Sequence, residues 1–279
     1  MAEQWRVLVA GCGYVGSALA ERLVRAGDSV WGLRRRPVGL PEGVVPFAAD
    51  LSDPGSLGGL PVGLDQLVYA AAADGSEEGA YRAAYVDGLR NLLDALQKQG
   101  QSPRRVVFAS STAVYGQQDG EWVDENSPTD ASGFRGQIML EGERLVRQGV
   151  YPGTSLRLGG IYGPERTRVI VQVRRGDAIC SPRPIYSNRI HRDDCAGALH
   201  HLLALPKPEA VYLGVDREPA DICEVYHWLA AELGVSMPLT AAEAGTPRGS
   251  NKRCNSDRLV SSGYRFKYPS YREGLASLL

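Results

Sequence analysis

Three glycines near the start of the chain have the spacing of a phosphate-binding turn. Gly11, Gly13 and Gly16, with Tyr14 and Val15 between them, form the pattern G-x-G-x-x-G directly after a short apolar run. The first glycine permits a tight turn, the second lets the backbone approach a pyrophosphate, and the third lets the next helix pack closely on the strand. The N–H groups at the helix N-terminus would face the phosphates. The pattern therefore predicts a dinucleotide site.

Arginines at the end of the second expected strand indicate which dinucleotide is bound. NAD-binding sites usually carry an acidic residue here for the ribose 2′-hydroxyl, whereas arginine accommodates the 2′-phosphate of NADP. The sequence reads Leu33-Arg34-Arg35-Arg36, without an acid. Guanidinium groups bind phosphate through charge-assisted, bidentate bonds. We therefore expect NADP in preference to NAD, and the structural alternative is a solvated basic loop.

Strands that alternate with helices must position these residues. Short apolar runs typical of buried parallel strands stand at residues 7–10, 30–33, 44–48, 67–71, 105–109 and 155–158. Apolar residues at helical spacing lie between several of them, at about 15–27, 80–99 and 136–148. This alternation predicts an α/β fold, namely a Rossmann-type doubly wound parallel sheet.

The same patterns predict how the chain is divided. We expect a dinucleotide-binding domain over residues 1–163 and mainly a smaller C-terminal substrate lobe over residues 164–279. A helix at about 193–205 is expected to pack back onto the first domain. Further elements of the lobe are a strand at 210–215 and a helix that Asp221 caps and that ends at about Leu233.

Composition and charge exclude several classes of protein. The chain has 279 residues and a formal net charge of −1, so nothing indicates binding to nucleic acid or to an anionic membrane surface. No apolar run is long enough to span a bilayer, and we expect no signal peptide, because the first residues lead directly into a strand-like run. We expect a cytoplasmic monomer or homodimer whose partner is a small-molecule substrate.

The cysteines are predicted to be reduced thiols. The chain has five of them, an odd number, and no C-x-x-C pair. Scattered cysteines in a chain without an export signal rarely form disulfides. The sequence also lacks a spaced cluster of histidine, cysteine and carboxylate residues. We therefore expect neither a disulfide nor a metal site.

Several further motifs follow one another in the order of a known family. They are Asp50-Leu51, Tyr69-Ala70-Ala71-Ala72, the segment ASSTAVYG at 109–116, the segment LRLGGIYGP at 156–164 and Ile190-His191-Arg192-Asp193-Asp194. Over nearly its whole length the chain resembles the extended short-chain dehydrogenases/reductases, or NAD-dependent epimerases/dehydratases. The resemblance implies that Asp50 and Leu51 hold the adenine and that the alanines lie under the adenosine ribose. It also implies that Ser110, Leu158 and Gly160 belong to the cofactor site.

The chain departs from this family at the residues that carry catalysis. Typical members have Tyr-x-x-x-Lys on the helix after the fifth strand, where the lysine lowers the pKa of a proton-exchanging tyrosine. Two registers are possible here, and they place at these positions either Gly133 and Gln137 or Arg135 and Met139. Tyr85 stands where the family has an asparagine. The resemblance is therefore to an atypical branch without the usual catalytic pair.

Other residues could supply the missing chemistry. Ser111 stands at the family's catalytic hydroxyl and could anchor a substrate carbonyl, although a strand-end serine can instead bind the backbone. Tyr162, near the expected nicotinamide, and His191, which titrates near neutrality, are candidate acids. Their structural alternatives are a packing tyrosine and a loop histidine that precedes a capped helix. The catalytic candidates are thus Ser111, Tyr162 and His191, and the proton donor stays open.

Three arginines are candidates for binding an anionic group of the substrate. They are Arg135, Arg157 and Arg189. The sequence thus favours an NADP-binding oxidoreductase or epimerase-like protein that acts on a polar small molecule such as a nucleotide sugar. The alternative is a catalytically silent NADP-binding protein that senses redox state or regulates a partner. The missing tyrosine and lysine favour this alternative, whereas the retained Ser111, Arg157 and His191 and the C-terminal lobe favour the enzyme.

Overall fold

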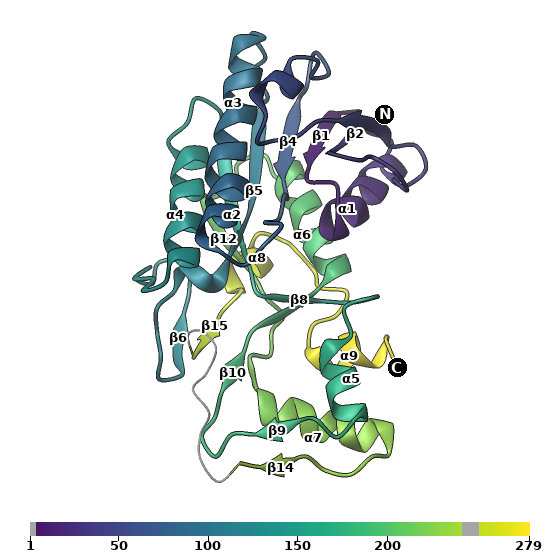
Figure 1. The fold of residues 1–279 in the computed structure, drawn as a ribbon, viewed down its shortest axis with the longest axis vertical. Coiled ribbons are helices and arrows are strands. Elements are labelled where there is room, and N and C mark those ends of the chain that lie inside the picture. The colour runs from purple at the N-terminus through teal and green to yellow at the C-terminus, as the bar shows by residue number, and fades with distance from the viewer. Residues whose placement is uncertain (1–3, 242–250) are drawn as a thin grey trace.

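The centre of the protein is one parallel sheet. The computed structural model describes residues 4–241 and 251–279, and within them seven strands pair in the order β12-β7-β5-β4-β1-β2-β3 (Figure 1). The strands are β1 Arg6–Ala10, β2 Ser29–Arg34, β3 Val45–Ala48, β4 Gln66–Tyr69, β5 Arg105–Ser111, β7 Gly153–Leu158 and β12 Val211–Gly214. This Rossmann-type sheet confirms the predicted fold class.

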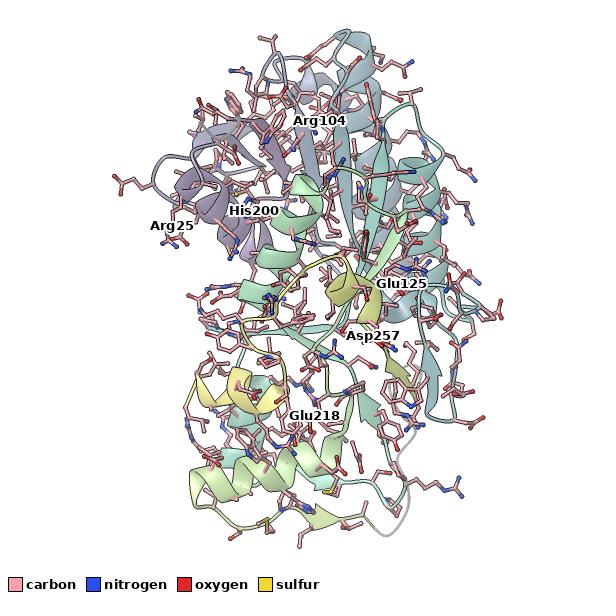
Figure 2. The ribbon with its side chains drawn as sticks, turned by 180° about the vertical axis from the view of Figure 1, so that it is seen from behind. Arg25, Arg104, Glu125, His200, Glu218 and Asp257 are labelled. Atoms are coloured by element: carbon pink, nitrogen blue, oxygen red, sulfur yellow. A yellow bond between two sulfur atoms is a disulfide. The ribbon has the colours of Figure 1, made fainter. Side chains whose placement is uncertain are left out.

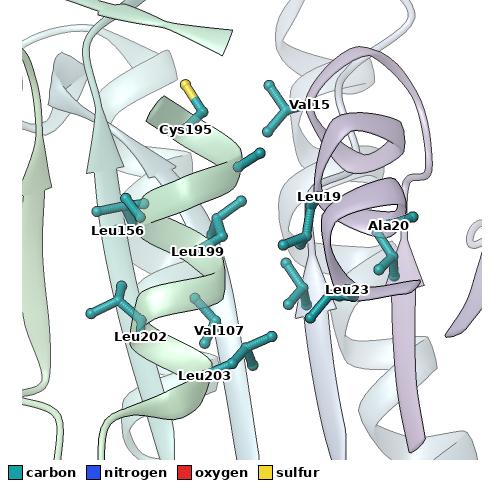
Figure 3. Packing of buried hydrophobic residues seen from close by; sticks show 14 of the residues in the cluster. Val15, Leu19, Ala20, Leu23, Val107, Leu156, Cys195, Leu199, Leu202 and Leu203 are labelled. Carbon is teal, nitrogen blue, oxygen red and sulfur yellow. The ribbon is translucent and has the colours of Figure 1, made fainter. Parts of the chain in front are cut away.

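Helices cover both faces of the sheet because successive strand residues point to opposite sides. In β1, Val7 and Val9 belong to one apolar cluster, whereas Leu8 and Ala10 belong to another. The first cluster lies under helices α1 Tyr14–Arg25 and α6 Arg192–Ala204, which pack against each other (Figure 3). The second lies under α3 Gly88–Lys98 and α4 Phe134–Arg147. Both layers are therefore held by buried aliphatic side chains.

The central sheet also includes a strand from beyond residue 163. Strand β12, expected in the smaller lobe, pairs with β7 at the edge of the central sheet, and α6 lies along α1. Glu125 fastens this edge, because its buried carboxylate accepts a hydrogen bond of 2.8 Å from the N–H of Leu213 (Figure 2). The central unit is thus built from both parts of the sequence.

The helix expected at about 80–99 is interrupted. It consists of α2 Glu78–Arg82, a π-helical segment η2 Ala83–Asp87, and α3. A π turn joins each residue to the fifth one along, and such turns are frequent at functional sites. Here the segment carries Tyr85. Two 3₁₀ turns follow β3 and β5, namely η1 Pro54–Leu57 and η3 Thr112–Val114.

A third apolar cluster holds the smaller lobe together. It includes Ile170, Val225, Leu229 and Tyr271 and lies among α5 Arg168–Arg174, α7 Ile222–Leu233 and α9 Tyr271–Ala276. As expected, the carboxylate of Asp221 caps α7 by accepting a bond from the N–H of Cys223. The remaining short elements are β6 Glu121–Val123, β8 Gly160–Tyr162, β9 Ile179–Cys180, β10 Tyr186–Ser187, β11 Arg189–His191, β13 Ala220–Asp221, β14 Leu239–Thr240, β15 Lys252–Cys254 and α8 Asp257–Ser261.

Two of the cysteines differ from the expectation of reduced thiols. Cys180 of β9 and Cys223 of α7 form a disulfide, with their Cα atoms 5.0 Å apart. The prediction was wrong because 43 residues separate this pair and only the packing of β9 on the start of α7 brings it together. Cys12, Cys195 and Cys254 are free and buried.

A buried ion pair joins α4 to the central sheet. Arg157 of β7 donates from Nε and Nη2 to the two carboxylate oxygens of Glu143, each at 2.8 Å, and from Nη1 to the hydroxyl of Tyr115. Ser110 donates to the same carboxylate at 2.7 Å. Glu143 is fully buried. Although burial opposes the charge of Arg157, its bonds to Glu143 raise the pKa of the guanidinium above its ordinary value.

We predict that Glu143→Ala costs roughly 3–5 kcal/mol of unfolding free energy, because it leaves the Arg157 charge buried without a partner. Glu141→Ala is the matched control on the same helix. Glu141 pairs with the exposed Arg82 at 3.0 Å, and such surface pairs contribute about 1 kcal/mol or less. Urea denaturation of both variants measures the difference, and similar losses would contradict this assignment.

Candidate functional site

A cavity of about 540 Å³ opens where the central strands end. Its walls come from the carboxyl ends of β1, β2, β4, β5 and β7, the edge at which open α/β sheets bind ligands. Most of the predicted cofactor residues line it: Gly11, Gly13, Tyr14, Val15, Arg34, Arg35, Asp50, Leu51, Ala70, Ala71, Ala72, Ser110 and Leu158. Gly16 and Gly160 do not. The structure thus brings this predicted set together in one place.

The three glycines have distinct surroundings. Gly11 has a φ of +84°, and a Cβ there would lie 2.2 Å from the backbone nitrogen of Ala71. A Cβ on Gly16 would lie 2.4 Å from the carbonyl oxygen of Gly11, so this glycine lets α1 approach β1. A Cβ on Gly13 would meet no atom within 4 Å, and Gly13 begins α1 without a capping side chain. The helix N-terminus therefore faces open space that a pyrophosphate fits.

We predict that Gly13→Val abolishes dinucleotide binding without unfolding the protein, since its side chain would enter that open space. Gly16→Val is the contrasting variant and should destabilise the fold, because its Cβ would press on the backbone of Gly11. Titration with NADPH and thermal unfolding measure the two effects. Retained binding in a folded Gly13→Val protein would show that the glycine turn is only structural.

Charged groups gather at the far end of β2. The Nη1 of Arg34 donates to the carbonyl oxygen of Cys12 at 3.4 Å, and its buried Nε has no partner in the described residues. Arg35 is exposed and pairs with Asp74 at 2.7 Å, which raises the pKa of Arg35. Bonds from Ser52 lower the pKa of Asp50. This end of the cavity therefore offers an orphaned guanidinium N–H group and a second guanidinium that is held by an exposed acid.

Hydroxyl groups line the other end of the cavity. The Oγ of Ser111 accepts a bond of 3.1 Å from the N–H of Ala113, so its own proton is free to be donated. Tyr85 lines the same cavity from η2. Burial raises the pKa of Tyr85, which keeps the phenol protonated at neutral pH. Met139 of α4 also lines this wall.

The two predicted acids, Tyr162 and His191, face the smaller lobe instead of the cavity. Among the described residues, the buried hydroxyl of Tyr162 has no hydrogen-bond partner, and it points at α9, where a Cβ on Gly274 would lie 1.8 Å from it. The Nδ1 of His191 accepts a bond from the N–H of Asp193, and its ring packs on Tyr268 at 4.2 Å. Burial lowers the pKa of His191. Neither residue lines the cavity.

The three arginines predicted to bind an anionic substrate do not line the cavity either. Arg157 forms its ion pair with Glu143. Arg189 is buried beside Asp216, and burial raises the pKa of Asp216 to about 8. Arg135 is exposed, lies over the ring of Tyr81 at 5.3 Å and donates to the carbonyl of Ser76. A third arginine lines the cavity besides Arg34 and Arg35: it is Arg166, which lies 4.1 Å from the ring of Tyr14.

Sequence reasoning thus missed Tyr85, Arg166 and Asp74. The signal for Tyr85 was present, because a tyrosine replaces the asparagine that the resemblance leads one to expect. Arg166 and Asp74 lie in loops whose course follows from the fold alone.

No helix of the described residues is both long and apolar enough to cross a membrane.

The fold and the cavity define a dinucleotide-binding member of the doubly wound proteins, and the comparisons name the family. The profile of the NAD dependent epimerase/dehydratase family matches residues 7–214, so the chain belongs to this family, as predicted. Protein YeeZ of Escherichia coli K12 is 28% identical over 280 residues, which cover 95% of this chain and 96% of YeeZ. UDP-glucose 4-epimerase of Streptomyces lividans is 28% identical over 152 residues, covering 50% of this chain and 46% of the epimerase.

A solved structure agrees with this assignment. A protein of Methylobacillus flagellatus, described as an NAD-dependent epimerase/dehydratase, is 39% identical and covers 99% of this chain and 98% of its own. Its TM-score of 0.84 means that the two chains share one fold over almost their full length.

Proposed function

We propose that the protein is an NADP-dependent oxidoreductase or epimerase that acts on a nucleotide sugar or a related polar carbonyl compound. The observation that carries the proposal is the cavity at the carboxyl edge of the sheet, with arginines at one end and two hydroxyls at the other. Membership of the family supports a nicotinamide dinucleotide. The similarity to UDP-glucose 4-epimerase supports a nucleotide-sugar substrate.

The preference for NADP follows from charge. Arg34 and Arg35 line the cavity at the carboxyl end of β2, and both could form charge-assisted bonds with a ribose 2′-phosphate. Gly13 and the first turn of α1 would hold the pyrophosphate. Arg166, at the cavity wall beside Tyr14, could bind the diphosphate of a nucleotide sugar.

Ser111 and Tyr85 would share the proton chemistry. When bound, the nicotinamide supplies hydride transfer to or from a carbon atom of the substrate. Ser111 can hydrogen-bond the carbonyl oxygen of that substrate, and Tyr85 can give the oxygen its proton or take it back. A phenol with a raised pKa is a weak acid, so this site should turn over more slowly than one with a lysine-activated tyrosine.

We predict that NADPH binds more tightly than NADH and that Arg34→Gln weakens NADPH binding roughly 10- to 100-fold, the value of one charge-assisted bond. NADH binding should change little. Arg36→Gln is the matched control, because Arg36 is exposed and does not line the cavity. Calorimetric titration of the parent and both variants measures the affinities.

A companion variant examines the second arginine. Asp74→Asn removes the carboxylate that competes with a phosphate for Arg35 and should therefore tighten NADPH binding but not NADH binding. Equal affinities of the parent protein for the two cofactors, unchanged by Arg34→Gln, would refute the NADP assignment.

We predict that Tyr85→Phe and Ser111→Ala each lower turnover of the substrate, by roughly 10²–10⁴-fold for the loss of the positioned acid. Tyr162→Phe should have no such effect, because that hydroxyl faces α9. UDP-glucose with NADP⁺ is the first assay, with product epimers separated by chromatography. NADPH affinity of each variant serves as the check on folding.

The pH dependence separates the candidate donors. A tyrosine donor with a raised pKa stays protonated through pH 9, so carbonyl reduction should continue there. A histidine donor such as His191, whose pKa is lowered from 6.5, would lose its proton and its activity as pH rises through values below 6.5. Activity that disappears in that acidic range, and that survives Tyr85→Phe, would refute the role of Tyr85.

The second candidate function is a catalytically silent NADP-binding protein. The observation that favours it is Met139, an apolar residue on the cavity wall at one of the two positions that the family's lysine could occupy. Tight NADPH binding combined with no hydride transfer to any nucleotide sugar in a single-turnover assay would support this alternative over the enzyme.

A further inference from the structure

We propose that Cys180, Cys223 and His227 form a binding site for a soft divalent cation, Zn²⁺ above all, which opens when the disulfide is reduced. These residues lie in the smaller lobe and do not line the cavity described above. Their ligand atoms, two Sγ and the Nε2 of His227, lie within 4.8 Å of one another. Two thiolates and an imidazole are the donor set that zinc prefers.

The position of the histidine fits one shared metal ion. Its Nε2 lies 3.7 Å from the Sγ of Cys180 and 3.7 Å from the Sγ of Cys223. From ordinary Zn–S and Zn–N bond lengths, a sulfur and a nitrogen on one tetrahedral zinc are about 3.6 Å apart. The imidazole is therefore already at coordination distance from the point that both sulfurs could share.

Local structure brings the three side chains together. Cys223 and His227 are four residues apart on α7 and so lie on the same face of the helix, while Cys180 approaches from β9. Cys223 is in the first helical turn, where the helix N-terminus stabilises a thiolate. Cys180 is buried and His227 is exposed, so the fourth coordination position would face water.

Reduction is the step that opens the site. Sulfurs joined by a covalent bond cannot both serve as thiolate ligands, and two sulfurs on one tetrahedral zinc are about 3.8 Å apart. A dithiol reductant supplies two electrons and two protons, breaks the S–S bond to give two thiols, and is itself oxidised to a disulfide. Binding of Zn²⁺ then releases the two thiol protons. β9 and α7 are thus joined by a disulfide in one redox state and by a metal ion in the other.

Cobalt(II) is a suitable probe, because thiolate ligands give it an intense charge-transfer band that zinc lacks. The full-length protein is reduced with dithiothreitol, freed of reductant under nitrogen and titrated with Co²⁺. We expect the band to saturate at one ion per chain, to disappear on addition of Zn²⁺, and to be absent from the oxidised protein. The thermal unfolding temperature of the reduced protein should rise with Zn²⁺.

Variants decide whether these three residues are the ligands. Cys223→Ser and His227→Ala should each lose the thiolate–cobalt band or weaken Co²⁺ binding, and Cys223→Ser should also lose the thermal shift with Zn²⁺. Cys254→Ser, at a free buried thiol, and His200→Ala, on α6 in the central unit (Figure 2), are the matched controls and should bind as the parent does. No band in the reduced parent, or an unchanged band in Cys223→Ser, would overturn the proposal. Circular dichroism confirms that each variant is folded, and NADPH binding keeps this test separate from that of the proposed function.

Discussion

The backbone of Gly11 lies directly against that of Ala70 and Ala71, and the cavity depends on this contact. A Cβ at residue 11 would lie within 2.6 Å of three backbone atoms, so the two strand ends could not meet with any other residue there. The contact joins the ends of the neighbouring strands β1 and β4. The strands after β1 are added on one side of this pair, as β2 and β3, and the strands after β4 are added on the other side, as β5, β7 and β12. From this point α1 leaves with its N-terminus over the cavity, and the alanine turn leads on to the loop that carries Asp74.

The arginines of the central sheet differ in how tightly they are held. Arg157 is locked by Glu143 in the interior, where a charge without a partner is costly, and it keeps α4 in place behind Ser110. Arg34 and Arg35 are instead held loosely, by a carbonyl oxygen and by an exposed acid. A ligand phosphate could replace Asp74 as the partner of Arg35 at little cost, because water already screens this exposed pair. The same residue type is thus structural at one site and available at the other.

Local patterns were enough to predict most of the fold and most of the residues that line the cavity. The alternation of apolar runs located the central strands, and the glycine pattern located the turn, because both are properties of neighbouring residues. Side-chain direction was harder to foresee. Arg157 lies in register with Ser110 on the adjacent strand, so it meets Glu143 rather than a ligand. The disulfide and the course of the Arg166 loop depend on contacts between distant segments, which a single sequence does not reveal.

The direction of Tyr85 depends on the number of residues in the π-helical segment η2. In a regular α-helix, residues four apart share a face, so Tyr85 would follow Leu89 into the core under the sheet. The wider turn of η2 lets α3 keep its apolar face on the core while Tyr85, only partly buried against that core, also lines the cavity. Loss of one residue between 83 and 87 would restore a regular helix and rotate Tyr85 away. Relatives that share this site would therefore tolerate substitutions along these two helices more readily than a change in their length.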